Sequence, residues 1–178
     1  MKPIISFLKN VLLIFELGIV IALVHWEKVL FVGIIALDQL SKMKVVSTIS
    51  RGEIIPIIPD IFQLTYILNP GAAFGILPNQ RIFFIAAGIV LLVLAAFFYP
   101  KLKKSDKMLK FGTISLVGGA TANLIDRAQS GYVIDFIYFR NWPVFNFADV
   151  AIVIGMFTLI YAILFKIETT DDSIEGLR

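Results

Sequence analysis

Long apolar stretches separated by polar segments dominate the pattern along the chain. The clearest is the uncharged run of residues 82–100, which lies between Arg81 and Lys101. A helix rises about 1.5 Å per residue, so a run of this length crosses a hydrocarbon core about 30 Å thick. Further apolar stretches of similar length lie at residues 29–46, 109–128 and 146–165. The pattern predicts four transmembrane helices.

The segment between the first two predicted spans has a different pattern. Residues 62–66 alternate apolar and polar side chains, which is typical of a strand. Pro56 and Pro59 lie just before them and argue against a helix. Residues 130–144 are rich in aromatic and β-branched types, so we expect them to join the same sheet. The predicted fold is an all-α polytopic membrane protein with a small β-sheet resting on the membrane surface.

Composition agrees with a membrane protein and narrows the possible chemistry. Hydrophobic residues make up 58% of the 178 residues, whereas soluble domains have about 45–50%. The chain has no cysteine and a single histidine, His25. Thiolate nucleophiles and multi-histidine zinc sites are therefore excluded, and no GxSxG motif accompanies His25. Carboxylates remain the candidates for acid–base work, and we expect neither a metal nor a cofactor.

The distribution of charge predicts the topology. Five lysines lie within residues 101–110, between two predicted spans. Such a cluster can bind nucleic acid, but between spans it is more typical of a cytoplasmic loop. We therefore expect no nucleic-acid partner, and we place the segments 47–80 and 129–145 on the extracytoplasmic side. Residues 167–178 form an acidic cytoplasmic tail that we expect to be disordered.

Residues 1–28 precede the first predicted span and leave several interpretations open. Residues 11–24 are apolar, but Glu16 interrupts them. A signal peptide lacks a convincing small-residue cleavage site here. A fifth span would leave Lys2 and Lys9 outside, against the positive-inside tendency. We favour an interfacial or loosely attached helix; an extension created by a mis-assigned start codon is the remaining alternative.

Polar side chains gather near the outward ends of the predicted spans. An ionisable group within a span costs about 2.5–3.5 kcal/mol on insertion scales, so its presence needs a reason. Asp38 and Lys42 are four residues apart, which places them on one helical face where they can pair. The other members of this group are Asn123, Asp126, Arg127, Asp135, Asn146 and Asp149.

These residues also have structural explanations. Asp38 and Lys42 can form a structural ion pair. Asp126 and Arg127 can be membrane-edge residues that extend into water. Asn146 can cap the last predicted helix, and an acidic residue in the first turn of that helix is favourable.

A functional interpretation explains the whole group at once. Two carboxylates brought together cannot both ionise cheaply, so one keeps a proton. The ionised member can activate a water molecule while the protonated member supplies an acid, which cleaves a peptide bond without metal, thiol or histidine. A transporter or channel is a rival interpretation, but it predicts acids near the middle of the membrane and usually an internal repeat. A structural subunit of a larger complex is a second rival, and it leaves the convergent acids unexplained.

Five short sequence blocks follow one another along the chain. They are 38–42 (DQLSK), 69–75 (NPGAAFG), 118–127 (GGATANLIDR), 133–136 (VIDF) and 145–149 (FNFAD). In this order they resemble the blocks of a known family, the bacterial lipoprotein signal peptidases (signal peptidase II), and the resemblance covers roughly residues 29–166. One departure is Ala122, where the family usually has glycine.

The resemblance implies an aspartic endopeptidase that removes the signal peptide from prolipoproteins by cutting before a diacylglyceryl-modified cysteine. It places the catalytic pair at Asp135 and Asp149. The positions that match substrate-binding residues are Asn69, Gly71, Asn123, Arg127 and Asn146. Asp38, Lys42 and Asp126 match positions that organise the site.

The resemblance further implies where the protein works and with what. Residues 29–166 would form a four-span peptidase domain in the bacterial cytoplasmic (inner) membrane, with its active site at the extracytoplasmic edge. The expected partners are a diacylglyceryl-modified prolipoprotein substrate and membrane lipid. We expect the chain to act as a monomer.

Overall fold

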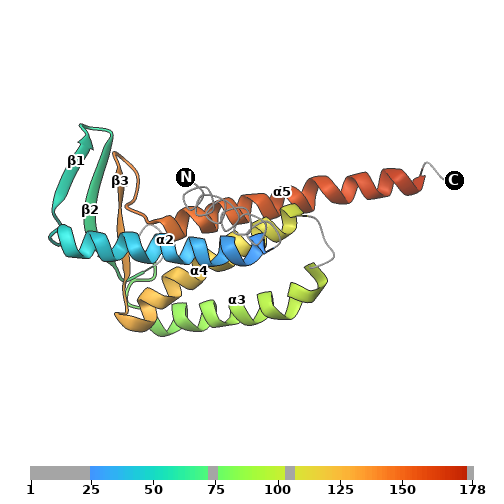
Figure 1. The fold of residues 1–178 in the computed structure, drawn as a ribbon, viewed down its shortest axis with the longest axis horizontal. Coiled ribbons are helices and arrows are strands. Elements are labelled where there is room, and N and C mark those ends of the chain that lie inside the picture. Colours follow the sequence, from blue (N-terminus) through green and yellow to red (C-terminus); the bar gives the residue numbers. More distant parts are fainter. Residues whose placement is uncertain (1–24, 72–75, 103–106, 176–178) are drawn as a thin grey trace, which may run out of the picture.

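The computed structural model describes residues 25–71, 76–102 and 107–175, which form four helices and three strands (Figure 1). The helices are α2 (Trp26–Thr48), α3 (Arg81–Leu102), α4 (Lys107–Gln129) and α5 (Phe147–Glu175). The strands are β1 (Ile54–Ile58), β2 (Phe62–Asn69) and β3 (Val133–Phe139). The helices run alongside one another and the sheet stands at one end of the bundle (Figure 1). The mostly helical fold with a small sheet agrees with the prediction.

The sheet joins two segments that are far apart in the sequence. Its strands are antiparallel in the order β1-β2-β3, so the segments before α3 and before α5 meet in it. The alternation at residues 62–66 predicted a strand, and β2 confirms it. β3 likewise confirms that residues 130–144 contribute to the sheet. Pro56 lies in β1 at the edge of the sheet, where a missing N–H is tolerated, and the register shifts directly after it.

The sheet is attached to the bundle through the end of α2. Val45 of this helix and Ile49 directly after it form a buried apolar cluster with Phe136 and Ile137 of β3. Aromatic rings extend the cluster, because Phe62 and Phe139 stack with their centroids 5.1 Å apart. Burial of these side chains fixes β3 beside the last turns of α2. The same contact determines where Asp135 of β3 lies.

α4 is the central helix, and small residues let its neighbours approach closely. A Cβ added to Gly119 would overlap the carbonyl oxygen of Ala148 in α5. A Cβ added to Gly155 of α5 would overlap the backbone of Leu116 in the same way. Ala122, at the position where a glycine was expected, is fully buried and accommodated. Small residues on α4 and α5 therefore allow the two helices to approach closely.

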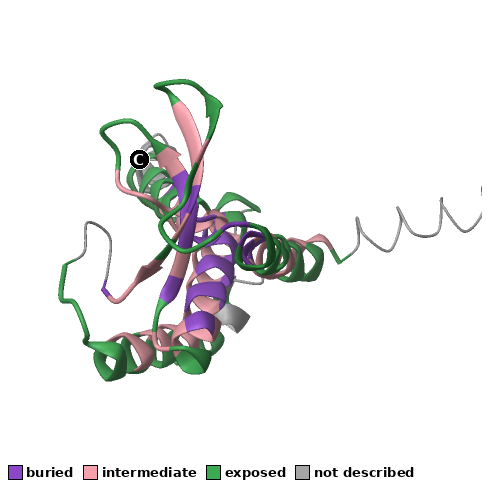
Figure 2. Ribbon diagram, turned by 90° about the vertical axis from the view of Figure 1, so that its left-hand side faces the viewer, coloured by how far each residue is buried: buried purple, intermediate pink, exposed green. Residues whose placement is uncertain are grey.

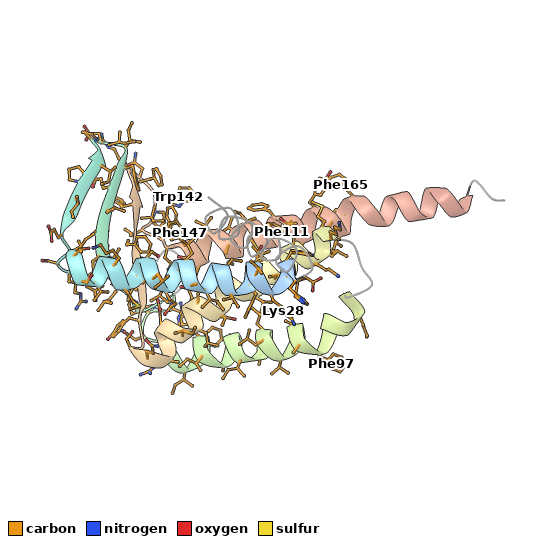
Figure 3. All side chains as sticks on the ribbon, in the orientation of Figure 1. Lys28, Phe97, Phe111, Trp142, Phe147 and Phe165 are labelled. Atoms are coloured by element: carbon orange, nitrogen blue, oxygen red, sulfur yellow. The ribbon has the colours of Figure 1, made fainter. Side chains whose placement is uncertain are left out.

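α3 lies at the outside of the bundle and packs mainly against α4. Its large apolar side chains face outward: Ile82 is 84% exposed and Phe97 is 69% exposed. Figure 3 shows outward-pointing side chains along α3 and α5, including Phe97 and Phe165. Buried positions concentrate instead on α4 and β3 (Figure 2). An apolar outside around a partly polar inside is the pattern expected of a protein surrounded by lipid.

Within the described part of the chain, three helices are long and apolar enough to cross a membrane. These segments are Arg81–Phe98, Lys107–Gln129 and Phe147–Phe165. α2 has the length, but Asp38, Lys42 and Lys44 make its second half more polar.

Two predictions about the ends of the chain have different outcomes. The helix predicted within residues 1–28 falls mostly outside the described residues, and α2 begins at Trp26. The expectation of a disordered tail is wrong as far as Glu175, because α5 continues without a break to that residue. Figure 1 shows α5 running past the ends of the other helices. Continuation of the preceding hydrogen-bonded helix adds one bond per residue, so a polar tail can extend it where it could not start one.

Candidate active site

The structure brings the predicted polar residues together at the end of the bundle that carries the sheet, which we call the sheet end. Asp135 projects from the middle of β3 and is 3% exposed. Asp149 lies in the first turn of α5 and is half-buried. Both carboxylates line one groove between the helices and the sheet. The convergence predicted from the sequence therefore exists in three dimensions.

Asn146 connects the two aspartates. Its side-chain oxygen accepts a hydrogen bond from the Asp149 N–H (2.9 Å), and its own N–H donates to the Asp149 carboxylate (3.2 Å). This reciprocal pair is a capping box, so the predicted helix cap is confirmed. The Asn146 side-chain amide also donates to the Asp135 carboxylate at 2.7 Å. One fully buried side chain thus starts α5 and holds the second aspartate.

Asn69 at the end of β2 supplies the other contact to Asp135. Its Nδ2 donates to Asp135 Oδ2 at 2.8 Å. Its Oδ1 accepts from the Gly71 N–H at 2.9 Å, which fixes which end of the amide faces the carboxylate.

Asn123 of α4 holds Asp149 by the same principle. Its Nδ2 donates to Asp149 Oδ1 at 2.7 Å. Its Oδ1 accepts from the Lys42 ammonium at 3.0 Å, so the cation orients the amide. Asn69, Asn123 and Asn146 therefore each have their oxygen occupied by a donor, and each turns its NH₂ toward an aspartate.

Lys42 is the centre of a buried ion network. It is 1% exposed, and its Nζ lies 2.7 Å from both Asp38 and Asp126. The predicted pairing of Asp38 with Lys42 is confirmed. Asp126 is buried, so the interpretation of it as a residue extending into water is wrong. The carboxylates find further donors at backbone N–H groups: Ala148 donates to Asp38 and Ile134 donates to Asp126.

Two residues in this region were not assigned a role from the sequence. Gln39 donates to Asp126 at 2.8 Å and to the Ala122 carbonyl oxygen at 3.3 Å, so it connects α2 to α4. A polar side chain within a predicted span was the available signal. Arg81 donates to the carbonyl oxygens of Arg127 and Ala128 and caps the end of α4. Its position at the start of an apolar run gave no indication of this contact.

Arg127 forms one wall of the groove. Its guanidinium lies 4.7 Å from the centroid of the Phe84 ring of α3 and donates to the Gly71 carbonyl oxygen at 2.8 Å. It therefore connects α4 both to α3 and to the segment that follows β2. A guanidinium held on an aromatic face is well placed to retain its charge beside carboxylates.

The electrostatics of the site favour a retained proton. Burial, and the nearby Asp149 carboxylate, raise the pKa of Asp135 to about 7, against the opposing effect of the donors Asn69 and Asn146. Four carboxylates and two cations meet at the sheet end, namely Asp38, Asp126, Asp135, Asp149, Lys42 and Arg127. An excess of negative charge in a buried site disfavours complete ionisation.

The groove itself is polar at one end and apolar along most of its length. Its volume is about 650 Å³. The aspartates, Asn69, Asn123 and Arg127 lie at the sheet end, and Trp142 lines the groove from the segment between β3 and α5. Apolar side chains of α3, α4 and α5 form the remainder, including Leu91, Leu124 and Val153. The groove suits a ligand with an apolar body and a polar group beside the aspartates.

The chain matches the family described as Signal peptidase (SPase) II over residues 30–165. It is similar to a lipoprotein signal peptidase of Pelotomaculum thermopropionicum, with 43% identity over 131 residues that cover 74% of this chain and 86% of that protein. A lipoprotein signal peptidase of Halothermothrix orenii is 47% identical over 127 residues, covering 71% and 87%.

Solved structures show the same similarity. A bacterial membrane enzyme solved by the in meso method at 2.3 Å resolution superposes with a TM-score of 0.74 and 31% identity, covering 78% of this chain and 87% of that chain. A second such structure, at 1.9 Å resolution, gives a TM-score of 0.72, also with 31% identity, and covers 78% and 92%. Every residue of the polar cluster lies within the matched range 30–165.

Proposed function

Because the chain belongs to the signal peptidase II family, we propose that Asp135 and Asp149 are the catalytic pair with which it removes signal peptides from prolipoproteins. The cut falls before the diacylglyceryl-modified cysteine of the substrate. The observation that carries the assignment is that Asn146 binds both aspartates while both line the same groove.

The pair acts by sharing one proton. The ionised carboxylate takes a proton from a water molecule as that water attacks the scissile carbonyl carbon. The protonated carboxylate gives its proton to the carbonyl oxygen, which yields a tetrahedral intermediate. As the intermediate collapses, the carboxyl group that took the water proton gives it to the leaving amide nitrogen, and the other carboxylate takes a proton from one hydroxyl of the intermediate. One proton therefore remains on the pair at the end of the cycle.

The surrounding residues have two roles in this proposal. Asn69, Asn123 and Asn146 hold the carboxylates in the free protein. These three asparagines therefore lie next to the proposed catalytic groups, where they can contact the bound substrate. Arg127 and Gly71 line the path of the substrate backbone, where the absence of a Cβ at Gly71 allows close approach. Asp38, Lys42 and Asp126 organise the site through the amide of Asn123.

We further propose that α2 is a fourth membrane span. Its Asp38 and Lys42 are buried against one another, and its exposed residues between Val29 and Met43 are apolar or glycine, with Leu40 64% exposed and Met43 67% exposed. The exposed lysines of α2, Lys28 and Lys44, lie just outside this stretch. Between them the charges of α2 face protein and the exposed surface is apolar, which satisfies the requirement for insertion. With the lysines of residues 101–110 in the cytoplasm, the sheet and the aspartates lie at the extracytoplasmic edge of the inner membrane. The protein works there as a monomer.

Cleavage of a diacylated prolipoprotein by the purified protein tests the catalytic pair. We expect Asp135→Asn and Asp149→Asn each to abolish cleavage, because neither variant can both activate water and supply a proton. Asp60→Asn is the matched control, since Asp60 is exposed and lies outside the groove. Normal cleavage by either active-site variant, with all three proteins folded, would contradict the assignment.

A further inference from the structure

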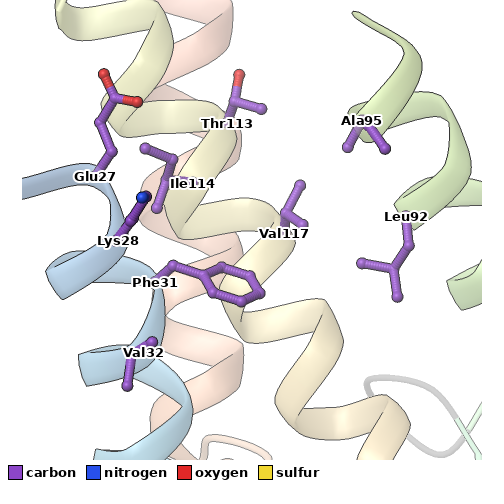
Figure 4. Close-up of a pocket in the computed structure, with 10 residues that line it drawn as sticks. Glu27, Lys28, Phe31, Val32, Leu92, Ala95, Thr113, Ile114 and Val117 are labelled. Atoms are coloured by element: carbon purple, nitrogen blue, oxygen red, sulfur yellow. The ribbon is translucent and has the colours of Figure 1, made fainter. Parts of the chain in front are cut away.

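A second cavity lies at the opposite end of the bundle, where α3 ends and α4 begins (Figure 4). We call this the lysine end. The cavity lies between α2, α3 and α4 and has a volume of about 430 Å³. Figure 4 shows the Phe31 ring projecting from α2 into the space that Leu92 and Ala95 face from α3. None of its lining residues belongs to the active-site groove, so the two cavities are separate.

The cavity combines an apolar interior with charge at its edge. Most of its walls are aliphatic or aromatic, and Glu27 and Lys28 of α2 line its rim. Glu27 is paired with Lys110 of α4 at 2.8 Å. Lys28 is exposed, and its side chain makes no ion pair with any residue in the described part of the chain. The rim therefore presents one positive charge that no carboxylate of the described residues neutralises.

The position of the cavity gives access from the bilayer. α3 packs mainly against α4, so no helix or strand of the described residues closes the space between α2 and α3 at the side of the bundle. Lys101 and Lys107 add positive charge at the same end. Lysines near a membrane surface attract anionic lipids. A ligand that matches this cavity has an apolar chain that enters from the bilayer and an anionic group that stays at the membrane surface.

We propose that this cavity binds one acyl chain of an anionic phospholipid, with the lipid phosphate held by Lys28. The inference goes beyond the proposed cleavage chemistry, because no residue of the cavity contacts the aspartates. A bound chain would fill the space between α2 and α3 and connect two helices that otherwise meet through α4.

Native mass spectrometry of the intact protein in detergent tests the proposal. Phosphatidylglycerol and phosphatidylcholine with identical acyl chains are supplied at equal concentrations. We expect the wild type to retain phosphatidylglycerol about fivefold more than phosphatidylcholine, the preference that one lysine near a lipid phosphate provides. Lys28→Gln should reduce the preference to near unity. Ala95→Phe should reduce retention of both lipids, because its ring fills the cavity.

Matched variants separate this site from general attraction. Lys44→Gln changes an exposed lysine of the same helix at the sheet end, and Val93→Phe enlarges an exposed residue of α3 outside the cavity. Both should bind lipid as the wild type does, and all four variants should cleave prolipoprotein normally, which makes the result independent of the proposed catalytic pair. Equal retention of the two lipids by the wild type would overturn the proposal. So would an unchanged preference in Lys28→Gln, or complete displacement of phosphatidylglycerol by soluble glycerol phosphate.

Discussion

At the sheet end, Lys42 is 1% exposed and contacts two carboxylates, whereas at the lysine end Lys110 contacts one carboxylate and both partners are partly exposed. Lysine is therefore a buried, doubly paired cation at the sheet end and a partly exposed, singly paired cation at the lysine end. A buried cation must be compensated almost completely, because the penalty for an unpaired buried charge amounts to several kcal/mol. A partly exposed ion pair is screened and contributes little. The comparison predicts that the sheet end is rigid and intolerant of substitution, while the lysine end is tolerant.

The largest effect is expected at the buried ammonium. Lys42→Met leaves Asp38 and Asp126 without their cation, so it should destabilise the protein by about 3–5 kcal/mol. It should also reduce cleavage, because Asn123 is no longer oriented toward Asp149. Thermal unfolding in detergent measures the first effect and the cleavage assay the second. Lys44→Met, an exposed neighbour in α2, should change neither. Similar unfolding temperatures for Lys42→Met and Lys44→Met would contradict the prediction that the buried lysine of the sheet end does not tolerate substitution.

The pH dependence of stability tests the buried carboxylate at the same end. The pKa of Asp135 lies near 7 in the folded protein, above its ordinary value of 3.8, so the folded state binds more protons between these values. Stability should therefore be unaffected by this group below about pH 4, fall as the pH rises toward 7 and remain lowered above it. The full difference is about 4 kcal/mol.

Asp135→Asn isolates this contribution. Its unfolding temperature, measured relative to the wild type, should rise between pH 4 and pH 7 and then become constant. If the difference in unfolding temperature between the variant and the wild type stays the same from pH 4 to pH 7, the pKa of the Asp135 carboxyl group is not raised in the folded protein.

Two glycines in α4 allow overpacking at the two ends to be compared, with the tighter contact at Gly119. A Cβ at Gly119 meets the turn that bears Asp149, and a Cβ at Gly112 meets Gly155 and Leu159 near the lysine end. Gly119→Ala and Gly112→Ala should each destabilise by about 1–3 kcal/mol through overpacking. Only Gly119→Ala should also lower kcat, because it displaces Ala148 and with it the first turn of α5. Equal losses of kcat in both variants would mean that the bundle transmits strain along its whole length.

The smallest effect is expected at the partly exposed pair. Lys110→Met removes the ion pair with Glu27 and should change stability by less than about 1 kcal/mol. Raising the salt concentration should reduce even this difference, since exposed pairs are screened. A loss as large as that of Lys42→Met would show that the lysine end is as demanding as the sheet end.

Local patterns were sufficient to predict much of the sheet end. The four-residue spacing of Asp38 and Lys42 predicted their pairing, and the position of Asn146 at the start of the last apolar stretch predicted the cap, because both contacts join residues that are close in sequence. Alternation of apolar and polar side chains at residues 62–66 predicted β2, because this alternation is also a property of neighbouring residues. The assignment of Asp135 came from family resemblance, since a single loop aspartate has no distinguishing local pattern.

Contacts between elements could not be predicted from the same patterns. The pairing of Lys42 with Asp126 depends on how closely α2 approaches α4, and the orientation of Asn123 depends on that pairing in turn. Gln39 was overlooked because its partners lie on a helix more than eighty residues away in sequence. The helical tail up to Glu175 was missed because composition describes a segment alone, whereas the end of an existing helix lowers the barrier to continuing it.

The placement of Asn146 has a consequence for how the enzyme is made. Asp149 belongs to the last helix of the described chain, and Asn146, which begins that helix, also holds Asp135. A ribosome delivers this helix after α2, α3, α4 and the strands, so every earlier stage of synthesis lacks one member of the proposed pair and one amide that holds the other. In the proposed mechanism, hydrolytic activity therefore requires the insertion of α5, and a chain that ends before this helix has no assembled pair.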